Sequence, residues 1–533
     1  MVGLVPGRRR TISNASSRAS SEATDPEDDT LVVEPDQGNV LSHIISQLRP
    51  GADLSRVVLP TFILEPRSML ERITNFMCHP EMLLPIPEID DPVERFVAVV
   101  KFYLSGWHIR PPGVKKPLNP VLGEIFTCYW DFPDKTRGYY ISEQTSHHPP
   151  KSSYFYMVPG HNIRVDGTLQ PRSRFLGNSA ASLMEGTAFL SLLNRGADPS
   201  KGERYSLTQP NMYARGILFG KMKYELGDHS YVKCPETGLS ADIEFKTKGW
   251  VSGTYNAIGG VIKNDHTGEI LYELSGLWNE EMFLKDVKTG QKDMFFNALR
   301  SKPSPPISRP LDEQEARESQ RLWAKTAQAV KDRNHELATE EKTKIEEAQR
   351  EEAAKRVNDG VEWHPRLFRP VKGGPGGPEE GEEDLEWIIN ATIDGATPEA
   401  QAEQIMAIYP VIKGQKPKQE NVIPPRASHS EASASSKDSH NGEGTLTDSA
   451  NESSTPHQFP SGEGAQPSNE SRPPLDPAHS STAEVQELLA STGKRAQGGP
   501  LIDFHGDMKK DLPNSTKRTD SMVSEDNFVD AEG

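Results

Sequence analysis

The chain has 533 residues, of which 26% are charged, and a formal net charge of −17. This acidic balance argues against nucleic acid as the main partner, because neutralising phosphates needs clustered lysine and arginine. The three cysteines, Cys78, Cys128 and Cys234, form no CxxC pair, so the sequence has neither a thiol zinc motif nor a disulfide framework and fits a reducing, cytoplasmic compartment.

Residues 1–37 are rich in serine, arginine and acidic residues and predict a disordered tail. This tail has no apolar core of signal-peptide length. No run of about 18 apolar residues follows anywhere, so no transmembrane segment is expected. The chain also lacks an initial Met-Gly and a final C-a-a-X box, so the sequence does not indicate a lipid anchor. If such a protein acts on membranes, we expect it to bind them transiently.

Residues 38–55 open with a short amphipathic helix. Its apolar residues recur at helical spacing, and Arg-Pro-Gly ends it at residues 49–51. The periodicity alone favours an ordinary surface helix docked on the core over a mobile cover for a cavity. Residues 56–123 predict an extended apolar segment, a helix from about Pro66 to Met77, and a second helix. The apolar face of that second helix consists of Phe96, Val99, Val100 and Tyr103.

Residues 124–300 contain many short runs of aromatic and β-branched residues, separated by glycine, proline, asparagine and aspartate. Such closely spaced strands predict a mainly β fold with helical extensions, built around one large antiparallel sheet or barrel. A barrel of more than about eight strands cannot fill its interior with side chains alone, so it can enclose a ligand.

Residues 301–371 predict a C-terminal helical part of the same domain, with a break between helices near residues 332–334. The aromatic cluster EWHPRLFRP then pins the chain back on the barrel. Residues 372–533 predict a disordered tail. Two islands interrupt it, DLEWIINATIDGATPEAQAEQIMAIYPVI and PLIDFHGDMKKDL. Each island is either a short motif that folds on a partner or a spacer with residual helix.

The stretch EQTSHHPP places two adjacent histidines before two prolines, and we weighed a metal site, a catalytic pair, a phosphate clamp and a plain turn. Neighbours on a strand point to opposite faces, and no cysteine or carboxylate stands at zinc-ligand spacing. Ser146 precedes His147, but no G-x-S-x-G elbow surrounds it. Two imidazoles at a strand end could donate to a phosphate. Taken alone, the stretch favours a plain turn.

Two further stretches carry cations. Lys116 and Asn119 stand between prolines in KKPLNPVLGE, and Lys342, Glu346 and Arg350 lie in one row of a predicted helix. On spacing alone, the first is a proline-rich loop and the second is a salt-bridge ladder on a solvated helix. Combined with a large barrel that can enclose a ligand, both stretches favour a phosphate-binding role more strongly.

EQTSHHPP resembles the signature of the oxysterol-binding-protein-related lipid-transfer family. The stretches KPLNPVLGE, YARGILFGKMKYELGD, IEFKTKGWVSGTYNAIGGVIK and EEAQRE resemble other blocks of this family, in the same order, over roughly residues 40–370. Thr145 departs from the family, which more often has valine there. GADLSRVVLPTFILEPRSMLERITNF is similar to the branch that carries phosphatidylserine rather than sterol.

The resemblance implies a large, incomplete antiparallel β-barrel that encloses a lipid cavity, with residues 40–49 as its lid. It implies that the phosphates of phosphatidylinositol 4-phosphate are bound at the mouth, where Glu346 orients its basic neighbours, by Lys116, Asn119, His147, His148, Lys342, Glu346 and Arg350. It also implies a cargo-lipid site formed by Leu54, Ser55, Arg56, Val57, Val58, Leu59, Lys116, Asn119 and Ser173.

The function that the resemblance implies is exchange of phosphatidylserine for phosphatidylinositol 4-phosphate between membranes. The partners are then membrane phospholipids, met at the membrane surface, for example at contact sites between the endoplasmic reticulum and the plasma membrane. The alternatives are exchange of a sterol for the same phosphoinositide, and lipid sensing through the tail without bulk transport. We expect no enzyme, since no C-x5-R loop is present, and no cofactor or metal.

Overall fold

A computed structural model describes residues 48–54, 59–109, 115–198, 201–217, 222–249, 253–374 and 385–415. The predicted tail at 1–37, most of the predicted lid helix, and the chain beyond residue 415 lie outside these ranges. Residues 55–58 of the predicted cargo site lie outside them as well.

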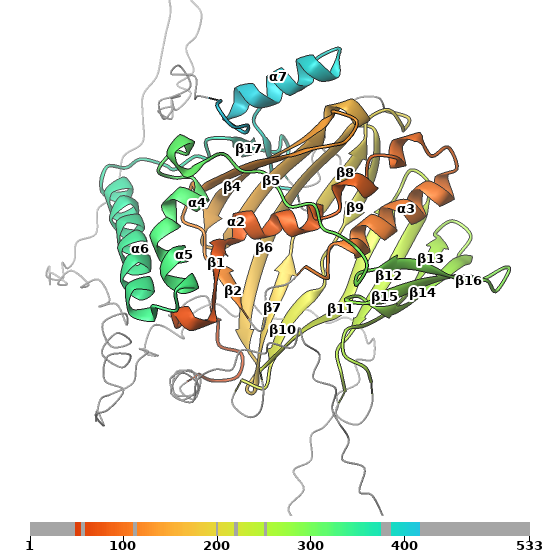
Figure 1. The fold of residues 1–533 in the computed structure, drawn as a ribbon, viewed down its shortest axis with the longest axis horizontal. Coiled ribbons are helices and arrows are strands. Elements are labelled where there is room, and N and C mark those ends of the chain that lie inside the picture. Colours follow the sequence, from red (N-terminus) through yellow and green to blue (C-terminus); the bar gives the residue numbers. More distant parts are fainter. Residues whose placement is uncertain are drawn as a thin grey trace, which may run out of the picture.

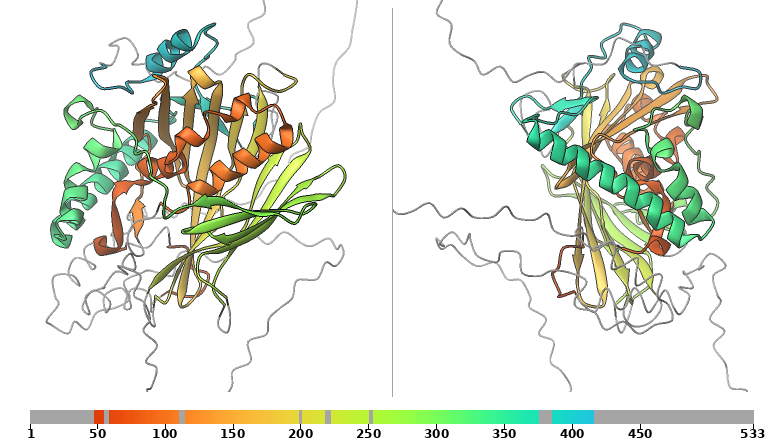
Figure 2. Two further views of the ribbon diagram at one scale, coloured as in Figure 1. Left: turned by 45° about the vertical axis from the view of Figure 1, so that its right-hand side comes forward. Right: turned by 90° about the vertical axis from the view of Figure 1, so that its left-hand side faces the viewer.

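Fourteen strands form one antiparallel sheet, whose main path runs β16-β15-β14-β13-β12-β11-β10-β7-β6-β5-β4-β3. The sheet is strongly curved (Figures 1 and 2), which confirms the predicted large antiparallel barrel. Its strands are β3 (Ile125–Asp131), β4 (Arg137–His147), β5 (Pro150–Val158), β6 (Ile163–Phe175), β7 (Ser179–Glu185), β8 (Ala188–Leu192), β9 (Glu203–Leu207), β10 (Asn211–Arg215), β11 (Lys223–Cys234), β12 (Leu239–Lys246), β13 (Ala257–Asn264), β14 (Ile270–Leu277), β15 (Glu281–Asp286) and β16 (Lys292–Asn297).

The long strand β6 pairs with β5 and also with two further strands. Its first half pairs with β8, and its second half pairs with β7. Strand β11 likewise pairs with β9 and with β10. The long strands β6 and β11 are therefore connected in two ways, through the paired strands β8 and β9 and through the paired strands β7 and β10. The cavity described below lies against β7 and β10.

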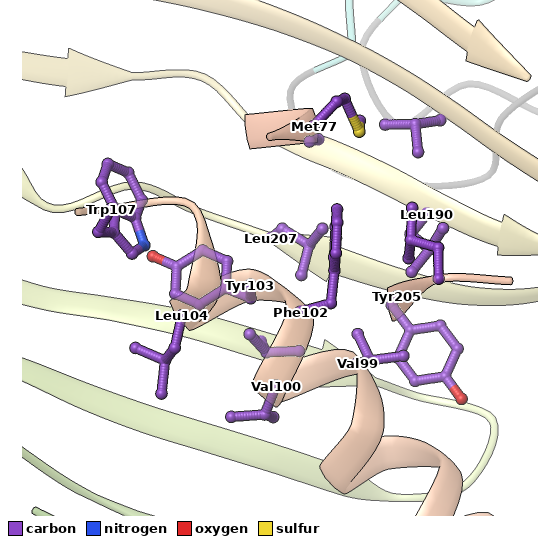
Figure 3. Packing of buried hydrophobic residues seen from close by; sticks show 14 of the residues in the cluster. Met77, Val99, Val100, Phe102, Tyr103, Leu104, Trp107, Leu190, Tyr205 and Leu207 are labelled. Carbon is purple, nitrogen blue, oxygen red and sulfur yellow. The ribbon is translucent and has the colours of Figure 1, made fainter. Parts of the chain in front are cut away.

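Helix α3 (Pro92–Ser105) lies across one face of the curved sheet (Figures 1 and 2). It begins where Asp91 accepts hydrogen bonds from the backbone N–H groups of Val93 and Glu94, with proline at the first helical position. The predicted apolar face is buried, which confirms this helix. Figure 3 shows its side chains packed among Leu190, Tyr205 and Leu207 from β8 and β9.

The helix expected from about Pro66 to Met77 differs from the prediction. Strand β1 (Leu64–Ser68) occupies its first part, and only α2 (Met69–Arg72) and the 3-10 turn η3 (Ile73–Met77) follow. Strand β1 pairs in parallel with β2 (Lys116–Leu118), so backbone pairing with a distant segment keeps residues 64–68 extended. This pairing also positions Lys116.

Helices α4 (Ser319–Leu322), α5 (Ala324–Lys331) and α6 (His335–Asn358) lie beside β1 (Figure 1). The break expected near residues 332–334 is present, with Arg333 at a positive φ of 54°. Asn334 then caps α6 by accepting a hydrogen bond from the backbone N–H of Leu337. The remaining 3-10 turns are η2 (Thr61–Ile63), η4 (Pro80–Met82), η5 (Ile86–Glu88), η6 (Pro159–His161) and η7 (Leu311–Glu313).

Strands β3, β4 and β5 are buried on both faces. On one face their side chains join the core under α3. On the other they pack against residues 367–371 and 385–411, including β17 (Phe368–Pro370), β18 (Trp387–Ile389) and α7 (Pro398–Ile408). The prediction that the chain is disordered from residue 372 onward is therefore wrong for residues 385–415. The first island docks on its own barrel, because the apolar outer face of β3–β5 needs a cover.

Candidate functional site

A deep cavity lies between the N-terminal helical segments and strands β6, β7 and β10. Its wall is mostly apolar, so it suits an aliphatic ligand rather than a water-soluble one. The apolar lining consists of Ile63, Met69, Ile73, Phe76, Trp107, Leu169, Phe175, Met184, Met212, Ile217 and Met222.

The same cavity has a polar end, where the predicted residues Lys116, Asn119, His147 and His148 all line its wall. His147 is the last residue of β4, and β5 begins at Pro150 opposite it. The turn between them contains a cis His148–Pro149 bond, and Ser146 donates a 2.7 Å hydrogen bond to the Pro149 carbonyl. The strand end therefore presents both imidazoles, whose ring centroids are 4.5 Å apart, to the cavity.

Positive charge accumulates around Lys116. Burial lowers the pKa of this lysine, and repulsion by Lys342 lowers it further. The carboxylates of Glu346 and Asp53 act in the opposite direction. Two cations that repel each other in a poorly solvated place form a site that an anion stabilises.

The predicted row on α6 stands beside this end of the cavity. Lys342 Nζ lies 2.5 Å from Glu346 Oε1, and Arg350 Nη2 lies 3.8 Å from Glu346 Oε2. Glu346 thus lies between the two cations, as the resemblance implies. In the part of the chain that the structure describes, the cavity wall does not include these three side chains. Lys342 and Glu346 act on the site electrostatically, through Lys116 and His147 respectively, whereas Arg350 is linked to them by its ion pair with Glu346.

Gln349 is a site residue that the sequence analysis missed. Its Oε1 accepts a 2.8 Å hydrogen bond from the backbone N–H of Leu122, so its amide nitrogen faces His147 Nε2 at 2.9 Å. An amide nitrogen only donates, so this contact assigns His147 the tautomer with its proton on Nδ1. The available signal was spacing, because Gln349 follows Lys342 by seven residues and shares its helix face.

The protonation of His147 depends on opposing influences. Burial lowers its pKa, and the adjacent His148 lowers it further. The Pro120 carbonyl and the Glu346 carboxylate act to raise it. The neutral imidazole is therefore favoured in this structure, and an anionic ligand would favour the protonated form.

Besides Lys116 and Asn119, three more of the predicted cargo residues line the cavity wall, namely Leu54, Leu59 and Ser173. Ser173 Oγ lies 3.4 Å from Ser182 Oγ, which lines the same wall. Residues 48–54 are anchored to the end of β6, where Gly51 N donates to the Phe175 carbonyl at 2.6 Å and Phe175 N donates to the Ala52 carbonyl at 2.9 Å. Leu54 and Phe175 thus meet at one rim of the cavity.

Thr145, where the sequence departs from the family it resembles, bonds within the sheet. Its hydroxyl lies 2.8 Å from Ser153 Oγ, and the side chain is buried. The cavity wall, over the residues that the structure describes, does not include it. The departure therefore leaves the ligand-facing chemistry unchanged.

Known proteins share sequence with most of this chain. The family model described as oxysterol-binding protein matches residues 43–331 and 326–394. The oxysterol-binding protein-like protein OBPa of Candida albicans is 54% identical over 395 residues, which cover 74% of this chain and 89% of that protein. Oxysterol-binding protein homolog 6 of Saccharomyces cerevisiae is 51% identical over 409 residues, covering 76% and 89% respectively.

The fold is also similar to a solved one. The crystal structure of the Osh1 ORD domain in complex with cholesterol has a TM-score of 0.56 and 23% sequence identity, covering 68% of this chain and 88% of that chain. This likeness shows a shared fold. Among the described residues, no helix combines the length and apolar character needed to cross a membrane.

Proposed function

Because the chain belongs to the oxysterol-binding protein family, we propose that it is a lipid-transfer protein that carries phosphatidylserine and phosphatidylinositol 4-phosphate in turn between membranes. The two lipids compete for one cavity, and a gradient of the phosphoinositide drives net movement of the cargo. The exchange forms and breaks no covalent bond. Selectivity is then a difference between two binding free energies.

The observation that carries this proposal is a basic cluster at the polar end of an apolar cavity. Lys116, His147 and His148 line that end, with Lys342 beside them. An amphiphile with an anionic head group satisfies both parts at once, since its chains contact the apolar wall and its phosphates relieve the repulsion between the cations. A sterol offers a hydroxyl instead and leaves that repulsion in place.

The choice of phosphatidylserine as cargo is supported by the stretch at residues 51–76, which resembles the serine-lipid branch of the family. Its Leu54 and Leu59 line the cavity. The proposed place of action is the cytoplasmic face of membranes, at contact sites between the endoplasmic reticulum and the plasma membrane.

The test is lipid transfer between liposomes, measured for a fluorescent phosphatidylserine, a fluorescent sterol and phosphatidylinositol 4-phosphate. We expect transfer of phosphatidylserine that accelerates when the phosphoinositide is supplied in the opposite membrane. Sterol transfer without phosphatidylserine transfer would overturn the choice of cargo. Stoichiometric binding without transfer of any of these lipids would favour a sensor.

The double variant His147→Ala, His148→Ala tests the phosphoinositide site. Hydrogen bonds to a charged group contribute roughly 1.5–3 kcal/mol each, so phosphoinositide binding is expected to weaken by at least about tenfold. Phosphatidylserine extraction is expected to change much less. The matched control is His229→Ala, His266→Ala, whose exposed imidazoles lie on β11 and in the turn between β13 and β14, outside the cavity wall. Equal phosphoinositide binding by the parent and by the first variant would contradict the assignment.

A further inference from the structure

A cluster of side chains that the proposed function does not use lies one layer behind the cavity wall. It consists of Cys78, His79 and His108, whose ligand-type atoms all lie within 4.8 Å of one another. His79 Nε2 and His108 Nε2 are 2.8 Å apart, and the two rings stack with centroids 5.1 Å apart. Cys78 and His79 follow η3, and His108 follows α3.

We propose that Cys78, His79 and His108 bind a divalent transition-metal ion of the zinc class. One thiolate and two imidazoles form a borderline-soft ligand set, which suits zinc far better than magnesium or calcium. Three protein ligands leave a fourth tetrahedral position for water. Zinc–nitrogen bonds of about 2.0–2.1 Å place two ligand nitrogens about 3.3 Å apart, so the histidine pair needs to open by only about half an ångström.

The surroundings hold the three residues in place. The Phe296 ring centroid lies 5.4 Å from that of His79 and 6.0 Å from that of His108. Ser301 Oγ lies 3.4 Å from His108 Nε2, and Ser304 N donates a 2.8 Å hydrogen bond to the Cys78 carbonyl. The segment after β16 thus covers the cluster, and a bound ion would join the segments that follow η3 and α3 beneath it.

The protonation states suit neutral nitrogen donors. Burial lowers the pKa of His79, and it lowers the pKa of His108 to about 4, so both rings are neutral. One Nε2 of the His79–His108 pair donates to the other, so the donor ring must move its proton to Nδ1 before both Nε2 atoms can bind a metal. Burial raises the pKa of the Cys78 thiol to about 12. Binding therefore replaces the S–H bond by a metal–sulfur bond and releases one proton to solvent. The Glu81 carboxylate, which interacts favourably with a charged His79, supplies negative potential for a cation.

The position of the cluster explains why cysteine spacing did not indicate it. Its ligands come from residues 78–79 and from residue 108, two separate segments with no CxxC pair between them. Packing creates the site, because Trp107 next to His108 and Met77 next to Cys78 belong to the same buried core (Figure 3). Trp107 also lines the lipid cavity, so the ion would stiffen a segment of that wall.

The test uses the full chain, stripped with a chelator and titrated with Co²⁺ in a thiol-free reductant. We expect one equivalent to bind with a thiolate-to-cobalt charge-transfer band, and Zn²⁺ to displace it. Cys78→Ser is expected to lose the band. Cys128→Ser and Cys234→Ser are the matched controls, because these cysteines are also buried but lie outside the cluster, and both are expected to keep the band. His108→Ala is expected to weaken binding by more than the roughly 10–100-fold of an outer-shell change.

A second measurement needs no variant. X-ray absorption of the parent protein loaded with one equivalent of Zn²⁺ should show one sulfur and two imidazole nitrogens around the metal. Absence of the cobalt–thiolate band, its survival in folded Cys78→Ser, or a zinc shell of nitrogen and oxygen alone would overturn the proposal. The last result would place the ion on other histidines and leave the pair as an ordinary N–H···N hydrogen bond.

Discussion

Gln349 connects helix α6 to the histidine pair and makes the orientation of His147 depend on a residue that does not line the cavity. Its carbonyl is held by the Leu122 backbone and its amide faces His147 Nε2. We regard Gln349 as a positioning residue, because it fixes the imidazole tautomer without contacting the place proposed for the lipid phosphates.

Replacing Gln349 by alanine removes the hydrogen bond that its amide donates to His147 Nε2. The His147 pKa is expected to rise, because a donor that opposes its protonation is removed. NMR titration of the imidazole measures this shift. Gln328→Ala is the matched control, since that exposed amide contacts only Asp332 among the described residues. An unchanged His147 titration would contradict the role.

Glu143, the first residue of the stretch EQTSHHPP, gives a second prediction about a single residue. Its carboxylate accepts 2.8 Å hydrogen bonds from the backbone N–H groups of Arg366 and Leu367, which hold the aromatic cluster against β4 as expected. Burial outweighs these donors and raises its pKa from 4.5 to about 7. Between these two pH values the unfolded chain loses its proton first, so the free energy of unfolding falls as pH rises.

The Glu143 contribution is at most about 3 kcal/mol, because one pKa unit corresponds to 1.36 kcal/mol. Glu143→Gln removes it, so the stability advantage of the parent over the variant should shrink as pH rises from 4.5 to 7. Urea unfolding across this window measures the change. Glu347→Gln, an exposed substitution on α6, is the control. Parallel profiles for the parent and Glu143→Gln would refute the prediction.

At the scale of elements, strands β3–β5 show what the sequence could predict and what was overlooked. Their runs are apolar without alternation, so both faces had to be covered. Phe126, Cys128 and Trp130 face α3, while Ile125 and Tyr129 face the other side. The cover for the outer face is the first of the two islands in the predicted tail, which forms β18 and α7. Its polar flanks led to the prediction of disorder.

The docking of this segment can be tested with Ile405→Ala. Ile405 is fully buried against the outer face of the sheet. Losing a buried isoleucine side chain costs about 2–5 kcal/mol, and the free energy of unfolding should fall by this amount. Ile270→Ala, at a position that is 44% exposed, should cost far less. If the segment instead binds only to a partner, both variants will unfold like the parent.

The sequence located the segments that form the candidate site but not their arrangement in space. The prolines and strand signals around Lys116 and His147 locate the two loops, and the helical row at residues 342–350 is regular enough to find from spacing. Their convergence depends on the parallel β1–β2 pair, which joins residues about fifty positions apart, and no local pattern encodes it. Gln349 and the cluster at Cys78 were missed for the same reason, since tertiary packing defines their partners.

At the scale of the whole molecule, the charge is unevenly distributed. The chain carries a formal charge of −17, yet one end of its cavity brings Lys116 and Lys342 close enough to repel each other. A local basic site on a strongly acidic protein attracts an anion to that site. The proposal of a single cavity with two competing lipids therefore makes Lys116 a shared contact, whereas His147 and Leu59 each serve one lipid.

Because Lys116 is proposed to contact both lipids, while Leu59 and His147 each contact one, variants at these positions should differ in which lipid they fail to extract. Lys116→Ala should weaken extraction of both phosphatidylserine and phosphatidylinositol 4-phosphate, because both head groups carry phosphate. Leu59→Asp should abolish phosphatidylserine extraction and affect the phosphoinositide less, since a carboxylate in this apolar wall is costly to bury and repels the cargo phosphate. The His147→Ala, His148→Ala variant should show the reverse preference.

Extraction of each lipid from liposomes, measured side by side, tests this pattern. The controls are Lys325→Ala, whose side chain is 81% exposed, and Leu299→Asp, at a position that is 68% exposed. Both make the same chemical change away from the cavity wall. If Leu59→Asp and the histidine variant lose the two lipids in equal proportion, the lipids do not occupy distinct parts of one cavity. Exchange must then depend on a step that all these residues share, such as the opening of the mouth.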